Sequence, residues 1–128
     1  MSLGAVHAQQ PARSIWDGVY TTEQAKRGSA LYAQNCASCH GPQLNGGEAA
    51  PPLAGIEFAG NWNGLTLGDL FERIRTSMPA DDPAKLSAQQ KADILAHMLS
   101  VGMFPAGMSD LSRETPVLAQ IKFEATKP

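Results

Sequence analysis

The segment Cys36-Ala37-Ser38-Cys39-His40 brings two thiols and an imidazole into five consecutive positions. Its two cysteines are the only ones among the 128 residues, so a scaffold held together by several disulfides is excluded. The chain contains only three histidines, so this coincidence of uncommon residue types is specific. We therefore take the segment as the principal candidate for the functional site.

The pattern is the C-x-x-C-H sequence of c-type haem attachment. It predicts thioether bonds from Cys36 and Cys39 to two vinyl groups on one haem edge, with His40 as an iron ligand through Nε2. Three other interpretations stay open. A dithiol redox site needs a βαβ setting, a zinc site needs four ligands, and the two cysteines can form a fortuitous structural pair.

A haem ligated by His40 needs a second axial ligand, and a methionine thioether suits ferrous iron. Met78 is the favoured candidate, because it precedes Pro79 in a loop 38 residues after His40. Met98 has the spacing of a core residue within a helix, whereas Met103 and Met108 lie beyond that helix. His97 is the alternative nitrogen ligand, although its apolar helical neighbours favour a packing role.

Composition restricts the class of protein further. Apolar residues make up 43% and charged residues 17%, which excludes a disordered chain. The net charge of −2 offers no basic face for nucleic acid. No apolar run is long enough for a transmembrane segment. Valine and isoleucine together number nine, so the chain is predicted to be all-α.

Three segments carry helical signals, each beginning at a capping pair. The first runs from Thr21, paired with Gln24, to about Asn35. The second follows Thr66 and Asp69, and the third follows Ser87 and Gln90 and ends at Gly102. Long loops over residues 41–63 and 78–86 separate them. Loops of this length in a small domain require something to order them, and a bound prosthetic group would do so.

Both ends of the chain are predicted to lie outside the main domain, which spans residues 21–108. Residues 1–20 contain small residues typical of the end of a secretory signal, so we expect a poorly ordered leader there. Residues 109–128 form a tail whose apolar positions suit a short helical turn packed on the core. These positions are Val117, Leu118, Ile121 and Phe123.

The chain resembles the small bacterial mono-haem cytochromes c with His/Met ligation, especially the modules found alone or with quinoprotein dehydrogenases. The resemblance covers about residues 21–123. It rests on the attachment motif, the Pro51-x-Leu53-x-Gly55 segment and the run from Phe58 to Met78-Pro79. Gly28 and Tyr32 match the first helix of the family. The resemblance implies a cytochrome c fold with three main helices and long loops wrapped around one covalently bound haem c.

The resemblance also implies supporting roles for residues around the haem. His40 is expected to donate its second ring N–H to the Pro51 carbonyl. Leu53 is expected to contact the haem, and Trp62 either donates its indole N–H to a propionate or packs in the core. The family usually has an aromatic residue where this chain has His97. The imidazole is expected to fill that place, although it can instead tune the haem environment.

The function implied is one-electron transfer by cycling haem iron between Fe(III) and Fe(II), with no enzymatic activity of its own. One alternative is a dedicated electron-accepting subunit of a quinoprotein dehydrogenase or oxidase. Another is a haem sensor or peroxidase-like protein in which Met78 does not ligate the iron.

Redox proteins are the expected partners, namely a dehydrogenase or a terminal oxidase, and a monomer is expected. The lysines are scattered rather than gathered in a ring, so electrostatic steering should be modest. They are Lys26, Lys85, Lys91, Lys122 and Lys127. Covalent haem attachment and the expected leader together predict an exported, periplasmic protein.

Overall fold

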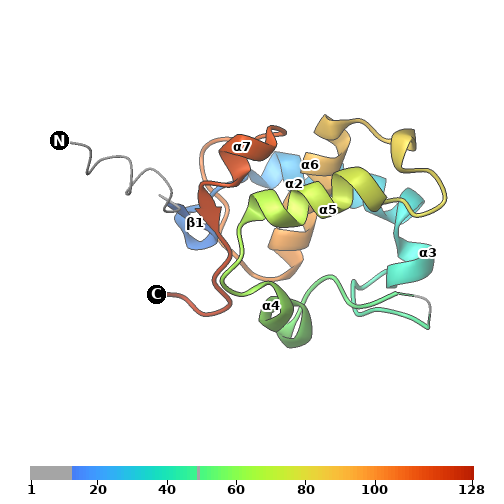
Figure 1. Cartoon of the computed structure of the whole chain (residues 1–128), viewed down its shortest axis with the longest axis horizontal. Helices are drawn as coiled ribbons and strands as arrows, with labels where there is room; N and C mark the ends of the chain where they lie inside the picture. The colour runs from blue at the N-terminus through green and yellow to red at the C-terminus, as the bar shows by residue number, and fades with distance from the viewer. Residues whose placement is uncertain (1–12, 49) are drawn as a thin grey trace.

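The computed structural model describes residues 13–48 and 50–128, and its three main helices are those predicted from the sequence (Figure 1). Helix α2 spans Thr22–Asn35, α5 spans Leu67–Ser77 and α6 spans Ala88–Val101. Helices α2 and α6 cross in the middle of the molecule, and α5 packs against α6. No helix in this part of the chain is long and apolar enough to cross a membrane.

The predicted caps start all three helices, with one difference. Complete capping boxes, from Thr66 to Asp69 and from Ser87 to Gln90, begin α5 and α6. At α2, the hydroxyl of Thr21 accepts from the Gln24 N–H, but the Gln24 side chain does not return to the cap. It is fully buried and bonds to Asp93 and to Leu111 instead. Residues distant in sequence therefore take the place of the cap as partners of the Gln24 side chain.

Shorter elements complete the fold. Helices α3, α4 and α7 span Ala37–His40, Ile56–Trp62 and Thr115–Leu118, and 3-10 turns η1 and η2 span Ile15–Asp17 and Pro83–Lys85. Helix α4 lies within the segment predicted to be a continuous loop. It has only seven residues, no side-chain cap and a single buried residue, Phe58, so its local signal is weak.

The helix crossing depends on a close backbone approach at Gly28. A Cβ atom there would lie 1.8 Å from the carbonyl oxygen of Asp93 in α6. Only glycine permits this approach, so the two helices contact each other through their backbones. The crossing is therefore close, although His97 replaces the aromatic residue usual in the family.

The two ends of the described chain pack together on the core. Strands β1, Arg13–Ser14, and β2, Ile121–Lys122, pair in parallel. Ile15, Val19 and Tyr20 are all buried, so the prediction of a leader over residues 1–20 is wrong for residues 13–20. Their order comes from partners about a hundred residues away, which no local pattern reveals. Residues 1–12 of the predicted leader lie outside the described residues.

The tail after residue 108 supplies much of that packing. Leu118 and Phe123 have no exposed surface, and Ile121 is 1% exposed. The ring of Phe123 meets Phe104 and Phe58 with centroids 5.5 and 6.0 Å apart. Val117, by contrast, is 47% exposed.

Candidate functional site

The attachment motif forms one tight turn at the end of α2. The N–H of Cys36 donates to the Tyr32 carbonyl, which ends α2, and the Cys36 carbonyl accepts from the N–H groups of Cys39 and His40. Residues Ala37–His40 of this turn are helix α3, with Cys36 as its N-cap. Both thiols are free, with Cys36 half-buried and Cys39 exposed. The turn therefore holds the two sulfur atoms and the imidazole of His40 on one short piece of backbone.

A hydrogen bond to the backbone orients the imidazole of His40. His40 is 7% exposed, and its Nδ1 lies 2.8 Å from the carbonyl oxygen of Pro51. This is the hydrogen bond expected from the family resemblance. Since a carbonyl only accepts, Nδ1 carries the proton, and Nε2 keeps a lone pair for a metal ion.

The electrostatics of the motif do not suit a dithiol redox site. Burial, and secondarily the charge of Cys39, raise the pKa of Cys36 to about 11. Redox-active Cys-x-x-Cys pairs work through a cysteine whose pKa is lowered. The raised pKa of Cys36 is the opposite of what such a reactive thiolate needs.

The Pro51–Gly55 segment leads from His40 to an apolar cavity. The N–H of Leu53 donates to the Leu44 carbonyl, and Leu53 is partly buried against the core. Beyond it lies a cavity of about 430 Å³. Its lining is mainly apolar and includes Ala54, Gly55, Phe58, Met98 and Leu99. Trp62 is half-buried, and its ring lies 6.3 Å from that of Phe58.

The residues present fit a haem. The fit rests on two free thiols at the attachment spacing and on an imidazole held with Nε2 available. Neither His40 nor Met78 lines the apolar cavity.

Met78 directly follows α5, where its N–H donates to the Ile74 carbonyl. Its side chain is half-buried. In Figure 1, the end of α5 and helix α3 lie toward the same end of the molecule. The other methionines differ. Met98 is 3% exposed within the core, as its helical spacing predicted, and Met103 and Met108 are 82% and 97% exposed.

His97 packs at the crossing of α2 and α6. Its ring centroid lies 5.4 Å from that of Tyr32, whose hydroxyl donates to the Gly41 carbonyl beside His40. Burial lowers the pKa of His97 below 6.5. These contacts are those of a residue filling an aromatic position.

Lys91 is a residue near the site that the sequence analysis counted only among scattered lysines. It is 2% exposed, and its Nζ donates to the carbonyls of Arg75 and Pro83 at 2.9 and 2.6 Å. Burial, followed by the charge of Arg75, lowers its pKa, while Asp82 raises it. A signal was present, because Lys91 stands three, four and seven positions before the buried residues Ile94, Leu95 and Met98.

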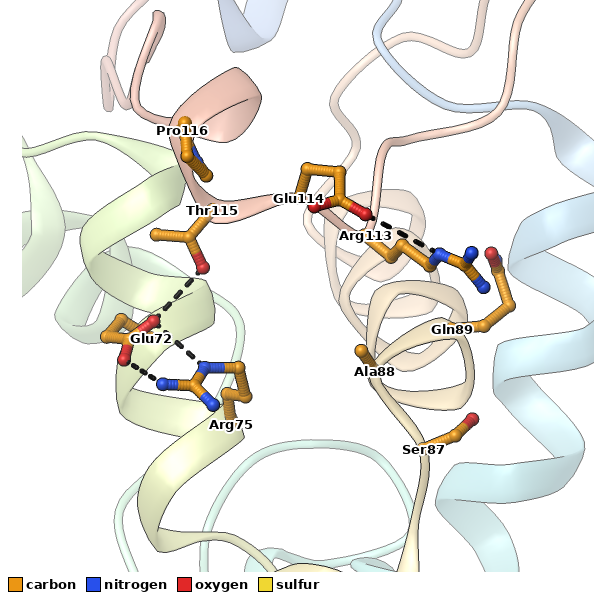
Figure 2. A pocket seen from close by; sticks show the side chains of 9 residues that line it. All are labelled: Glu72, Arg75, Ser87, Ala88, Gln89, Arg113, Glu114, Thr115 and Pro116. Carbon is orange, nitrogen blue, oxygen red and sulfur yellow. Dashed lines mark hydrogen bonds and ion pairs between the residues drawn. The ribbon is translucent and has the colours of Figure 1, made fainter.

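A separate pocket of about 460 Å³ lies at the surface between α5, α6 and α7 (Figure 2). Its charged side chains satisfy one another. Glu72 is bonded to Arg75 and to Thr115, and Arg113 lies 3.7 Å from Glu114. None of the candidate haem residues lines it.

Comparison with known proteins identifies the family and the fold of this chain. The family profile described as "Cytochrome C oxidase, cbb3-type, subunit III" matches residues 23–98, more than half of the chain. This range includes Cys36, Cys39, His40 and Met78. No curated protein matches the sequence.

The fold also occurs in a solved structure, titled "Crystal Structure of the Sulfane Dehydrogenase SoxCD from Paracoccus pantotrophus". The match has a TM-score of 0.55 at 23% identity, and covers 84% of this chain and 61% of that chain. The chain thus spans about three fifths of the length of that relative. Fold and family together confirm the predicted all-helical cytochrome architecture, and the chain belongs to this cytochrome c family of haem-binding electron-transfer proteins.

Proposed function

We propose that the chain is a one-electron carrier holding a single haem c through thioether bonds from Cys36 and Cys39. His40 and Met78 would ligate its iron. The observation that carries this proposal is the bond from His40 Nδ1 to the Pro51 carbonyl, because it leaves Nε2 free to ligate iron. When bound, haem supplies the Fe(III)/Fe(II) couple.

The chain has three tasks in this function. Pro51 holds the ring of His40 and raises its basicity. Phe58 and Met98 belong to the buried apolar core, which would keep water away from a haem packed on it and so limit solvent reorganisation during electron transfer. Met78 supplies a thioether, which favours Fe(II) and raises the potential. With both His40 and Met78 on the iron, no position would be left for a substrate, so we propose no enzymatic activity for this chain.

The exposed thiol of Cys39 marks the haem edge that would meet a partner. Redox proteins are the proposed partners, met in the periplasm or in another exported location. The weak net charge of −2 favours largely apolar docking over electrostatic steering.

A dedicated acceptor subunit of a dehydrogenase is the second candidate, and a structure titled a sulfane dehydrogenase shares this fold. Co-purification of a stable complex from cells would favour the dedicated acceptor. A freely diffusing holoprotein would favour the shuttle.

Optical spectroscopy of holoprotein made with a c-type maturation system tests the ligands. We expect a covalent low-spin haem with a near-infrared Met–iron band. Met78→Ala should abolish the band and allow rapid carbon monoxide binding to the reduced form, whereas Met108→Ala, at a 97% exposed methionine, should do neither. A high-spin spectrum, or a band that survives Met78→Ala, would contradict this ligation and favour the sensor or peroxidase-like alternative.

A further inference from the structure

We propose that Lys91 is a positioning residue that holds the Met78 loop closed over the iron. This inference rests on the proposed function, since it assigns Lys91 a role toward the ligand Met78. The ammonium group of Lys91 binds the backbone on both sides of Met78 at once. One acceptor is the carbonyl of Arg75, three residues before Met78, and the other is that of Pro83, five residues after it.

The geometry makes Lys91 a clamp at the base of this loop. The two carbonyls are eight residues apart in sequence, yet each lies within 2.9 Å of the same Nζ atom. Lys91 projects from α6, which is anchored to α2 through the close approach at Gly28. Through Lys91, the loop is therefore attached to the closely packed pair of helices α2 and α6.

Few other bonds hold this segment. The Met78 N–H donates to Ile74, and the Asp82 and Lys85 N–H groups donate to Pro79 and Asp82. The Ala84 N–H donates to the side chain of Asp82. These bonds are all local, so they shape the segment but do not attach it to the rest of the molecule. Hydrogen bonds from a charged donor are stronger than neutral ones, and two of them meet at Lys91.

Lys91 is only 2% exposed, so its charge contributes little to the solubility of the protein. The hydrogen bonds of Lys91 are also not those of an ion pair. Both bonds of Nζ go to backbone carbonyls, and the neighbouring Arg75 guanidinium is paired with Glu72. The charge of Lys91 is thus directed to the loop backbone.

Competition by imidazole at the ferric iron measures how often the loop opens. An external ligand binds only when Met78 has left the iron, so its apparent affinity follows the population of the open loop. Lys91→Met keeps the length and the apolar stem but removes both hydrogen bonds. We expect its apparent imidazole affinity to rise about tenfold or more over wild type, since two charge-assisted bonds are lost.

Lys85→Met is the matched control. Lys85 is an exposed lysine in η2, so this variant makes the same substitution and removes one positive charge from the Met78 loop itself, without touching either bond of Lys91. Its imidazole affinity should stay within about twofold of wild type, the range of ordinary surface substitutions. Equal affinities in Lys91→Met, Lys85→Met and wild type, or equal shifts in both variants, would overturn the proposal.

The wild-type spectrum distinguishes a failure of the proposed Met78 ligation from a failure of the role proposed for Lys91. Absence of a Met78-dependent near-infrared band refutes the proposed ligation, and the role of Lys91 falls with it. Presence of the band with unchanged imidazole affinity in Lys91→Met refutes the role of Lys91 alone. A loss of global stability with no change in affinity would likewise leave Lys91 as a structural residue only.

Hydrogen exchange on the wild-type holoprotein gives a test that needs no variant, should Lys91→Met fail to fold. The amides of Met78, Asp82 and Lys85 should exchange together and slowly, because one clamp closes the loop that contains them. Exchange at the rate of free peptide at Asp82 and Lys85 would overturn the proposal.

Discussion

Replacing Gly28 by alanine should weaken the whole fold, because the added methyl group would collide with backbone. Its Cβ would lie 1.8 Å from the Asp93 carbonyl oxygen and 2.4 Å from the Asp93 carbonyl carbon. An ordinary contact is about 3.4 Å or longer, so α2 and α6 must separate by roughly 1.5 Å. Overpacking costs about 3 kcal/mol at the upper end of its usual range, and alanine returns up to about 1 kcal/mol of helix propensity.

The expected net loss for Gly28→Ala is therefore about 2 kcal/mol or more of unfolding free energy. Guanidinium unfolding of the holoprotein, followed by far-ultraviolet circular dichroism, measures it. Gly60→Ala in α4 is the matched control, since a Cβ there meets nothing within 4 Å. Alanine at that helical position should be neutral or stabilise by up to about 1 kcal/mol. Equal stability of the two variants would refute the close backbone contact as the basis of the crossing.

Two further predictions concern the core and the pH dependence. Phe123→Ala should lower the unfolding free energy by about 3–5 kcal/mol, because Phe123 has no exposed surface, whereas Val117→Ala at a 47% exposed position should change it by less than about 1 kcal/mol. Denaturant unfolding compares the two, and a small effect at Phe123 would contradict a tail that belongs to the core. Burial lowers the pKa of His97 below 6.5, so stability should be fully present above pH 6.5 and decrease as pH falls through the folded-state pKa. Thermal unfolding from pH 7.5 to 4.5 should show a smaller acid loss in His97→Phe than in wild type, and parallel curves would exclude this contribution.

Local sequence patterns predicted much of this fold. The capping pairs at Thr66 and Ser87 begin α5 and α6 as expected, since both partners of each box lie three residues apart and need no distant contact. The attachment motif identified Cys36, Cys39 and His40 for the same reason. Its chemistry is contained in five consecutive residues.

The features that the sequence did not reveal all depend on residues far apart in the chain. Ile15 is buried, although it lies within the predicted leader, because the tail folds back onto it through the pairing of β1 with β2. Gln24 has the spacing of a capping residue, yet it bonds to Asp93 and Leu111, which approach it only after folding.

The same distinction between local and long-range contacts applies to the candidate site. The sequence by itself determined the C-x-x-C-H motif and the three main helices, because both follow from residues within a few positions of one another. Only the tertiary structure decided that Gly28 lies against Asp93 and that Lys91 binds the backbone on both sides of Met78. Those contacts join α2 to α6, and α6 to the loop after α5, so they depend on how separate helices pack and not on any local pattern.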